Sequence, residues 1–289
     1  MGPGWDGGRL SVAIPASLVS DTPHLREKTG KLGSVARACS IFGVTSIVLY
    51  ADDSRRNQET DLELCMEILR FVETPQYLRK AMFRLSENLR YTGILSPLQT
   101  PPHNVPHSIQ ESSVGDIRDG LIVGRRGSRL LVDVGLERVF ECLGDGPVGG
   151  RVTVRITHLG KIPAGEIAEA TKEGGAYWGY DVKRANSTLS RFVEEDKSDL
   201  VIGTSRFGSH LADVWSDLIS SIKTAKRTLV VFGSPKLGLK DILAQENKVP
   251  EDVFDWFVNT VPNQNVSTVR TEEAILISLG IFNLATSIY

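Results

Sequence analysis

The sequence predicts an α/β protein whose parallel sheet is interrupted by a small β-barrel. Both ends of the chain alternate short apolar runs with stretches of helical length and periodicity, as parallel sheets with crossover helices do. The middle instead shows several strand-like runs joined by short Gly-containing turns, without helices between them. We therefore expect residues 9–100 and 165–289 to form one α/β domain, interrupted by a barrel at residues 105–162.

The first α/β segment contains two predicted strands and two predicted helices. Residues 10–14 and 46–50 are apolar and rich in β-branched side chains, which is typical of buried strands. Residues 29–42 and 61–71 carry apolar side chains at helical spacing, and Gly43 suits the end of the first helix. This alternation predicts parallel strands joined by right-handed crossovers.

The middle of the chain begins with a linker that contains Pro97, Pro101, Pro102 and Pro106. Four runs with strand periodicity follow, at residues 120–126, 129–135, 138–144 and 151–157. The segment RRGS at 125–128 predicts a hairpin tip. Short strands at this spacing are typical of an OB-like barrel.

The second α/β segment places polar or glycine-containing loops after three predicted strands. The strand at 200–202 ends in GTSRFGS, the strand at 229–232 ends at Gly233, and residues 257–258 precede a polar turn at 259–267. Helices are expected at 213–222, after Gly238, and from 272 onward. Because open parallel sheets bind ligands at the carboxyl ends of their strands, we expect the site there.

Composition excludes several classes of protein. A net charge of −2 over 289 residues excludes a uniformly basic nucleic-acid binder, so any RNA surface must be local. The three cysteines and five histidines lack ligand spacing, which predicts no metal site and favours a reducing, cytoplasmic setting. We expect no membrane span or signal peptide, because no apolar run is long enough and MGPGWDGG lacks an apolar core.

The segment GSPKLGLK at 233–240 is close to a Walker A phosphate loop but departs from it at two positions. Leu239 stands where that loop has its phosphate-binding Lys, and Lys240 stands where it has a Ser or Thr for magnesium. No G-x-G-x-x-G fingerprint occurs either. The sequence therefore disfavours a nucleotide hydrolase.

Ordered sequence motifs extend over nearly the whole chain: VAIPASL at 12–18, YWGYDV at 177–182, LVIGTSRFG at 200–208, FGSP at 232–235, NTVPNQ at 259–264 and TVRTEEAI at 268–275. With them the chain resembles the SPOUT class of RNA methyltransferases, in particular the archaeal and eukaryotic subfamily of RNA uridine methyltransferases with an inserted OB-like domain. The resemblance implies a knotted, Rossmann-like sheet (a trefoil knot), S-adenosylmethionine as methyl donor, an RNA substrate (rRNA or tRNA) and a homodimer. The final predicted helix, apolar nearly all round, is an independent reason to expect a dimer.

The resemblance also implies which residues bind the donor. They lie in the three strand-end loops and are Thr204, Arg206, Gly233, Asn259, Thr260, Val261, Gln264, Thr268 and Val269. Asn265 departs from the pattern, since relatives usually have Gly there, and this leaves the loop conformation open. Candidate catalytic residues are Arg206, Arg270 and Glu273, although Glu272 and Glu273 are better explained as first-turn acids of a helix.

Basic residues in two places are expected to bind RNA. Arg26 and Lys28 lie on or near the first helix, and the barrel is rich in arginine, with Arg125, Arg126, Arg129 and Arg155 as candidates. Aromatic residues are few in the barrel, which favours recognition of RNA shape and backbone. The sequence identifies no general base. The alternative function is a non-catalytic RNA-binding or assembly protein that retains the fold.

Overall fold

The computed structural model describes residues 8–168 and 177–288, and it divides the chain into two compact units. The sheet unit contains residues 8–70, 88–96 and 179–288, and the barrel unit contains residues 71–87, 97–168 and 177–178. One holds a six-stranded parallel sheet with helices, and the other holds a closed five-stranded barrel. The predicted fold class is therefore confirmed.

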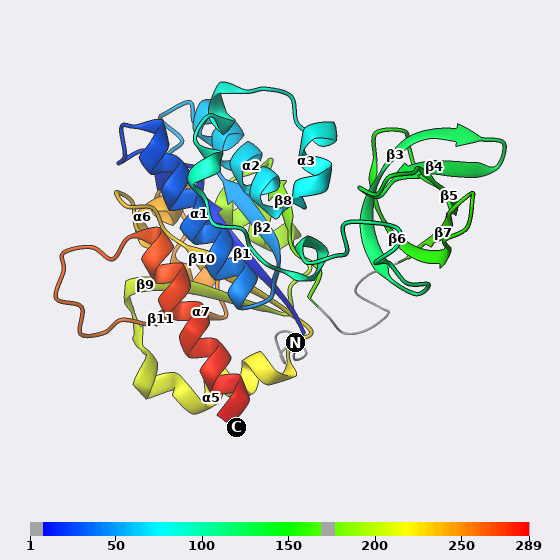
Figure 1. The fold of residues 1–289 in the computed structure, drawn as a ribbon. Helices are drawn as coiled ribbons and strands as arrows, with labels where there is room; N and C mark the ends of the chain where they lie inside the picture. Colours follow the sequence, from blue (N-terminus) through cyan, green and yellow to red (C-terminus); the bar gives the residue numbers. More distant parts are fainter. Residues whose placement is uncertain (1–7, 169–176, 289) are drawn as a thin grey trace. The chain divides into compact units, whose positions relative to one another are not determined.

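The sheet unit is built on six parallel strands in the order β11-β9-β10-β1-β2-β8 (Figure 1). The strands are β1 (Arg9–Pro15), β2 (Val44–Tyr50), β8 (Asp181–Arg184), β9 (Leu200–His210), β10 (Arg227–Phe232) and β11 (Trp256–Asn259). The central strand β1 pairs with β2 on one side and with β10 on the other. Segments from before and after the barrel thus share one sheet.

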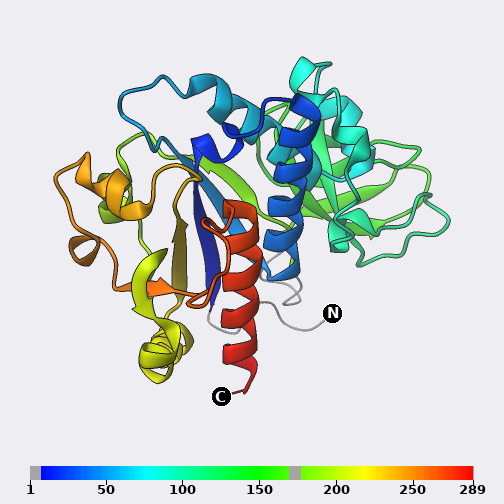
Figure 2. The same ribbon diagram turned by 90° about the vertical axis from the view of Figure 1, so that its left-hand side faces the viewer.

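Helices cover both faces of this sheet (Figure 2). The helical elements are η1 (Ala16–Val19), α1 (Leu25–Ile41), α2 (Glu59–Glu73), η2 (Glu87–Leu89), η3 (Thr92–Ile94), α4 (Leu189–Glu195), α5 (Leu211–Thr224), α6 (Leu239–Ala244), η5 (Pro250–Asp252) and α7 (Thr271–Ile288). Helices α1 and α7 pack side by side on one face, and α6 lies on the other with α4. Alternate residues of β10 point to opposite faces, and all are buried from Thr228 to Phe232. An apolar run without alternation is what a strand covered on both faces requires.

Strand β9 differs from the prediction, which placed a turn after residue 202. It continues to His210, because its two halves have different partners. Residues 200–204 pair with β10, whereas Ser209 and His210 pair with β11. Between Gly203 and Ser209 the pairing with β11 is interrupted, while the partners Phe257 and Val258 are consecutive. Residues 204–208 thus form a bulge, called the β9 bulge below.

The barrel unit contains β3 (Ile117–Arg126), β4 (Arg129–Asp133), β5 (Phe140–Leu143), β6 (Arg151–His158), β7 (Ala164–Ile167), α3 (Gln76–Met82) and η4 (Pro101–His103). Its strands close in the order β3-β4-β5-β7-β6, with antiparallel pairs except for parallel β5 and β7. The core includes Ile122, Leu130, Phe140 and Ile156. The predicted hairpin tip is confirmed, since Arg126 pairs with Arg129 across two residues.

The end of the barrel lies later than its predicted limit at residue 162. Gly165 pairs with Cys142 of β5 and with Ile156 of β6, so residues 164–167 close the barrel instead of starting the second α/β segment. A Cβ at Gly165 would lie 2.5 Å from a methyl of Val154, which explains a glycine where three strands meet. A four-residue strand of sequence AGEI has too few apolar residues to be visible in the sequence.

A network of ion pairs lies in the barrel unit. The Arg151 guanidinium binds the carboxylates of Glu73 and Asp119, and Asp119 also accepts hydrogen bonds from Thr153 (3.1 Å) and Trp178 (3.0 Å). Burial opposes the charge of Arg151, but the two carboxylates outweigh it and raise its pKa. Removing one partner would leave an uncompensated buried charge, which is strongly destabilising.

Candidate functional site

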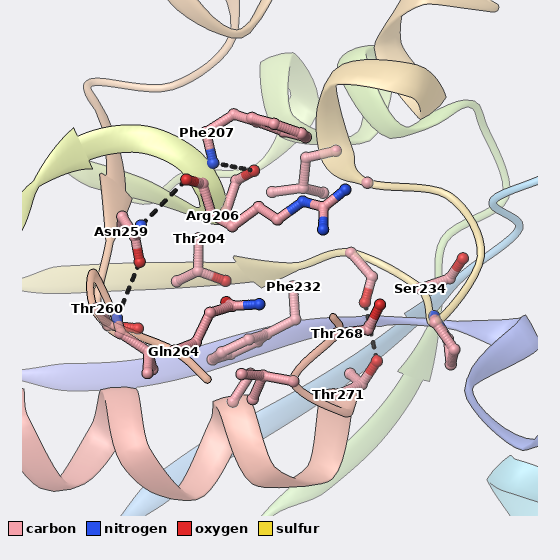
Figure 3. A pocket seen from close by; sticks show the side chains of 18 of the residues that line it. Thr204, Arg206, Phe207, Phe232, Ser234, Asn259, Thr260, Gln264, Thr268 and Thr271 are labelled. Atoms are coloured by element: carbon pink, nitrogen blue, oxygen red, sulfur yellow. Dashed lines mark hydrogen bonds between the residues drawn. The ribbon is translucent and has the colours of Figure 1, made fainter. Parts of the chain in front are cut away.

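A cavity opens at the carboxyl ends of β9, β10 and β11 (Figure 3). Its walls come from the β9 bulge, from the loop and first turn of α6 after β10, and from the segment between β11 and α7. The described lining residues are Thr204, Ser205, Arg206, Phe207, Phe232, Gly233, Ser234, Pro235, Lys236, Gly238, Leu239, Asp241, Asn259, Thr260, Val261, Gln264, Thr268, Val269, Thr271 and Ala274. The cavity is thus at the edge where parallel sheets bind ligands.

All nine residues expected to contact a methyl donor line this cavity. They come from three separate segments, at 204–206, 233 and 259–269, and the parallel arrangement of β9, β10 and β11 brings them together. Of the three candidate catalytic residues, Arg206 lines the cavity, whereas Arg270 and Glu273 are not among its lining residues.

The β9 bulge is held to the following loop by the side chain of Asn259. Its amide nitrogen donates to the backbone carbonyl of Arg206 (3.0 Å), and its amide oxygen accepts from the backbone N–H of Val261 (2.9 Å). Asn259 is buried, so if its side chain were removed, water could not easily replace the hydrogen bonds of its two partners. Gly208 completes the bulge, because a Cβ there would lie 2.6 Å from the backbone of Val258.

Arg206 crosses between two walls of the cavity. Its guanidinium donates to the backbone carbonyl of Ser267 (2.7 Å) and lies 4.7 Å from the centroid of the Phe207 ring. The side chain is exposed and no carboxylate pairs with it among the described residues. The positive charge is therefore available to an anionic group in the cavity.

Hydrogen bonds within the loop after β10, and one from Thr271 of α7, hold that loop in shape. The Ser234 hydroxyl accepts from the backbone N–H of Leu237 (3.0 Å), while the hydroxyl of Thr271 donates to the carbonyl of Gly233 (2.9 Å). A Cβ at Gly233 would lie 3.1 Å from the backbone nitrogen of Leu239. A larger residue would therefore have to displace the loop. Asp241, the one acidic residue among the described lining residues, accepts from the N–H of Gly238 (3.2 Å).

The acidic residues at the start of α7 are explained by the helix itself. The Glu273 carboxylate accepts from the backbone N–H of Arg270 (3.0 Å), as the third residue of a capping box does. Glu272 lies 3.7 Å from Lys31 of α1, and burial raises the pKa of its carboxyl despite that positive charge. These contacts agree with the interpretation of Glu272 and Glu273 as first-turn acids.

Several of the basic residues expected to bind RNA have carboxylate partners. In the barrel, Arg125 pairs with Asp145 (2.6 Å), Arg126 pairs with Glu141 (2.7 Å), and Arg155 lies 3.7 Å from Glu166. On α1, Lys28 pairs with Asp61 (3.4 Å). Arg26 and Arg129 are exposed. An RNA phosphate would have to exchange with these carboxylates, since exposed pairs contribute little stability and separate readily.

The cavity also contains residues that the sequence did not single out, among them Phe207, Lys236, Asp241 and Thr271. Phe207 lies in the loop after a predicted strand, and Thr271 lies directly before the last predicted helix. These positions were the only signal in the sequence that the two residues could line the cavity. Among the described residues, no group of His, Cys, Asp and Glu is suited to hold a metal ion. Within the same residues, the helices are too short or too polar to cross a membrane.

The chain matches the model of one protein family, described as "Putative RNA methyltransferase", over residues 9–282. It is 33% identical to a human 28S rRNA (uridine-N(3))-methyltransferase, in an alignment that covers 95% of this chain and 78% of the human protein. It is 31% identical to the fruit-fly protein of that name, over 94% of this chain and 61% of the relative. An uncharacterized protein of Haloarcula marismortui is 32% identical, over 95% and 98% of the two chains.

Proposed function

Because the chain belongs to the RNA methyltransferase family whose model it matches from residue 9 to residue 282, we propose that it methylates N3 of a uridine in rRNA with S-adenosylmethionine as donor. The relatives that carry this activity in their names support the choice of acceptor. The observation that carries the proposal is the cavity at the ends of β9, β10 and β11, where every predicted donor-binding residue lies.

The residues present fit such a donor. Val261 and Val269 are half-buried and offer apolar surface for an adenine ring, with the buried side chains of Phe232 and Leu239 in the same cavity wall. Arg206 and Lys236 offer positive charge for a carboxylate, and Asp241 offers acceptors for hydroxyl or ammonium groups. Gly233 lies close to the loop that follows it and has no side chain, so a ligand at this point would contact the backbone. The donor supplies an activated methyl group, so the chain's task is to hold it and the acceptor nitrogen within roughly 3–3.5 Å and in line.

The acceptor nitrogen must lose its proton as it gains the methyl group. A group within hydrogen-bond reach has to accept that proton. Asp241 is the one carboxylate among the described lining residues. Asp241 and Glu273 both cap a helix, since Asp241 accepts from the backbone N–H of Gly238 and Glu273 from that of Arg270. Asp241 is favoured over Glu273 because only Asp241 is among the described residues that line the cavity.

We also propose the trefoil knot and the homodimer for this chain. Support for the knot comes from the start of α7, where Thr271 binds the loop after β10, so that the carboxyl-terminal segment returns to that loop. Support for the dimer comes from the outer face of α7, where Leu276 and Leu284 are 48% and 56% exposed. A cytoplasmic location is proposed as well, on the ground that Cys39, Cys65 and Cys142 are free and buried.

The test combines donor binding with chemistry. Titration calorimetry of the purified chain with S-adenosylmethionine should show saturable binding, and incubation with rRNA should produce 3-methyluridine by mass spectrometry of nucleosides. Binding of RNA without binding of the donor would favour the alternative, a non-catalytic RNA-binding protein. Methylation at another atom or base would leave the enzyme class intact and correct the acceptor.

A further inference from the structure

Phe207 is a large apolar side chain that the fold leaves in solvent. Its exposed fraction is 64%, and it is the one aromatic residue in the exposed class among residues 8–168 and 177–288. Large aromatic rings normally contribute to stability by being buried. A single exposed apolar side chain is ordinary by itself. An aromatic ring that lines a ligand cavity, however, offers a flat face on which a ligand can stack.

The backbone that carries this ring is held on both sides. The backbone N–H of Phe207 donates to the hydroxyl of Ser205 (3.2 Å), and the preceding carbonyl is held by Asn259. On the other side, Gly208 lies against the backbone of Val258. The β9 bulge thus presents Phe207 in one place without burying it (Figure 3).

The neighbouring charge indicates what kind of ligand would cover the ring. The Arg206 guanidinium lies over one face of the ring, 4.7 Å from its centroid, and donates to the carbonyl of Ser267. The opposite face of the ring is therefore the one on which a ligand could stack. An aromatic face beside an arginine is the surface on which unpaired bases stack in single-stranded RNA, with the cation near the phosphate. A protein partner would be expected to cover a larger apolar patch, but the neighbours Ser205 and Arg206 are polar.

We propose that Phe207 stacks on the acceptor base of the RNA at the mouth of the cavity and so orients it toward the methyl donor. This inference rests on the proposed function. It assigns base recognition to the β9 bulge of the sheet unit, whereas the barrel was expected to provide shape and backbone recognition. The stacking face accepts any base, so hydrogen bonds elsewhere must provide selectivity for uridine.

The test separates contacts to bases from contacts to phosphates. The probes are a fluorescein-labelled oligouridylate of twelve nucleotides and an abasic ribose-phosphate oligomer of the same length, titrated by fluorescence anisotropy. Phe207→Leu keeps an apolar side chain without the ring, Phe207→Trp keeps an aromatic face, and Val249→Ala trims an exposed apolar residue of the same unit outside the cavity.

Wild type, Phe207→Trp and Val249→Ala should bind the oligouridylate more tightly than the abasic oligomer. Phe207→Leu should lose about 5- to 150-fold in affinity for the oligouridylate, the loss expected for one stacked base. Its affinity for the abasic oligomer should not change. Equal preference in Phe207→Leu and wild type, or no preference in wild type, would overturn the inference.

Donor binding is measured in parallel to separate this inference from the proposed function. S-adenosylmethionine should bind wild type and Val249→Ala with the same affinity, and Phe207→Leu should lose much less affinity for the donor than for the oligouridylate. Loss of donor binding in Phe207→Leu alone would move Phe207 into the donor site and end the stacking proposal. Absence of donor binding in wild type would instead contradict the proposed function.

Discussion

The side-chain amide of Asn259 holds the backbone carbonyl of Arg206 at 3.0 Å, although the two residues are 53 positions apart in the chain. This bond joins the end of β11 to the bulge of β9. The same side chain also fixes the first residue of the loop after β11, through Val261. Two of the three walls of the cavity therefore depend on one buried amide.

The first prediction concerns this amide. Asn259→Ala leaves the Arg206 carbonyl and the Val261 N–H without partners, so we expect a loss of about 1–3 kcal/mol in stability and weaker donor binding. Asn259→Asp keeps the acceptor for Val261 but turns a carboxylate oxygen toward the Arg206 carbonyl in a buried site, so it should destabilise the protein at least as much as the alanine variant. Thermal unfolding and titration calorimetry measure the two effects. Wild-type donor affinity in both variants would show that the bulge does not shape the donor site.

The second prediction concerns the loop after β10. A methyl group at residue 233 already meets the Leu239 nitrogen at 3.1 Å, so Gly233→Ala should weaken donor binding and Gly233→Val should abolish it. Both variants should remain folded, because the crowded contact is in a loop. Circular dichroism checks the fold, and calorimetry with S-adenosylmethionine checks the site. Tight donor binding by folded Gly233→Val would place the donor elsewhere.

The third prediction is a pH dependence that arises in the barrel unit. Burial lowers the pKa of His103 from 6.5 to about 4, and the charge of Arg79 acts in the same direction. The ring contacts the hydroxyl of Thr100 (2.6 Å) and the carbonyl of Val72 (3.4 Å) in a way that suits the neutral form. At a pH between about 4 and 6.5, His103 is therefore protonated in the unfolded chain and neutral in the folded one, so folding releases a proton.

The stability that neutral His103 contributes is present above pH 6.5 and is lost as the pH falls toward about 4. Replacement by a side chain that does not titrate, as in His103→Gln, should remove this dependence. We expect the difference in melting temperature between wild type and His103→Gln to shrink as the pH falls from 7 to 4. A constant difference across that range would contradict the assignment.

The fourth prediction concerns the outer face of α7. Leu276 and Leu284 are exposed, whereas Ile275 and Leu279 of the same helix are fully buried within the chain. If a second copy covers the outer face, Leu276→Glu with Leu284→Glu should convert a dimer into a monomer that stays folded. Light scattering at micromolar concentration gives the mass. A wild-type mass near 31.7 kDa, that of one chain, would contradict the proposed dimer.

A matched control keeps this experiment specific. Val249→Glu changes an exposed apolar residue of the same unit at another place, and should not alter the mass. Dissociation by that variant would indicate that any added charge weakens association, and the role of α7 would lose its support.

Local patterns in the sequence determined the elements around the site. The run 229–232 is apolar and contains enough β-branched residues to predict a strand buried on both faces, and Gly233 marks the end of that strand. The polar loop after β11 and the acidic first turn of α7 are equally visible, because turn residues and helix termini depend on a few neighbouring positions. These local patterns predicted the loops that form the cavity, and the family resemblance named nine of its twenty described lining residues within them.

Only the tertiary structure decided the features that depend on distant partners. The β9 bulge exists because one strand pairs first with β10 and then with β11, and no local pattern in GTSRFGS shows that change of partner. The pairing of Arg126 with Glu141 and the closing strand β7 likewise depend on which strands become neighbours. The exposure of Phe207 belongs to this group, since a large apolar residue is usually buried and only the pairing of β9 places this one on the bulge beside the cavity.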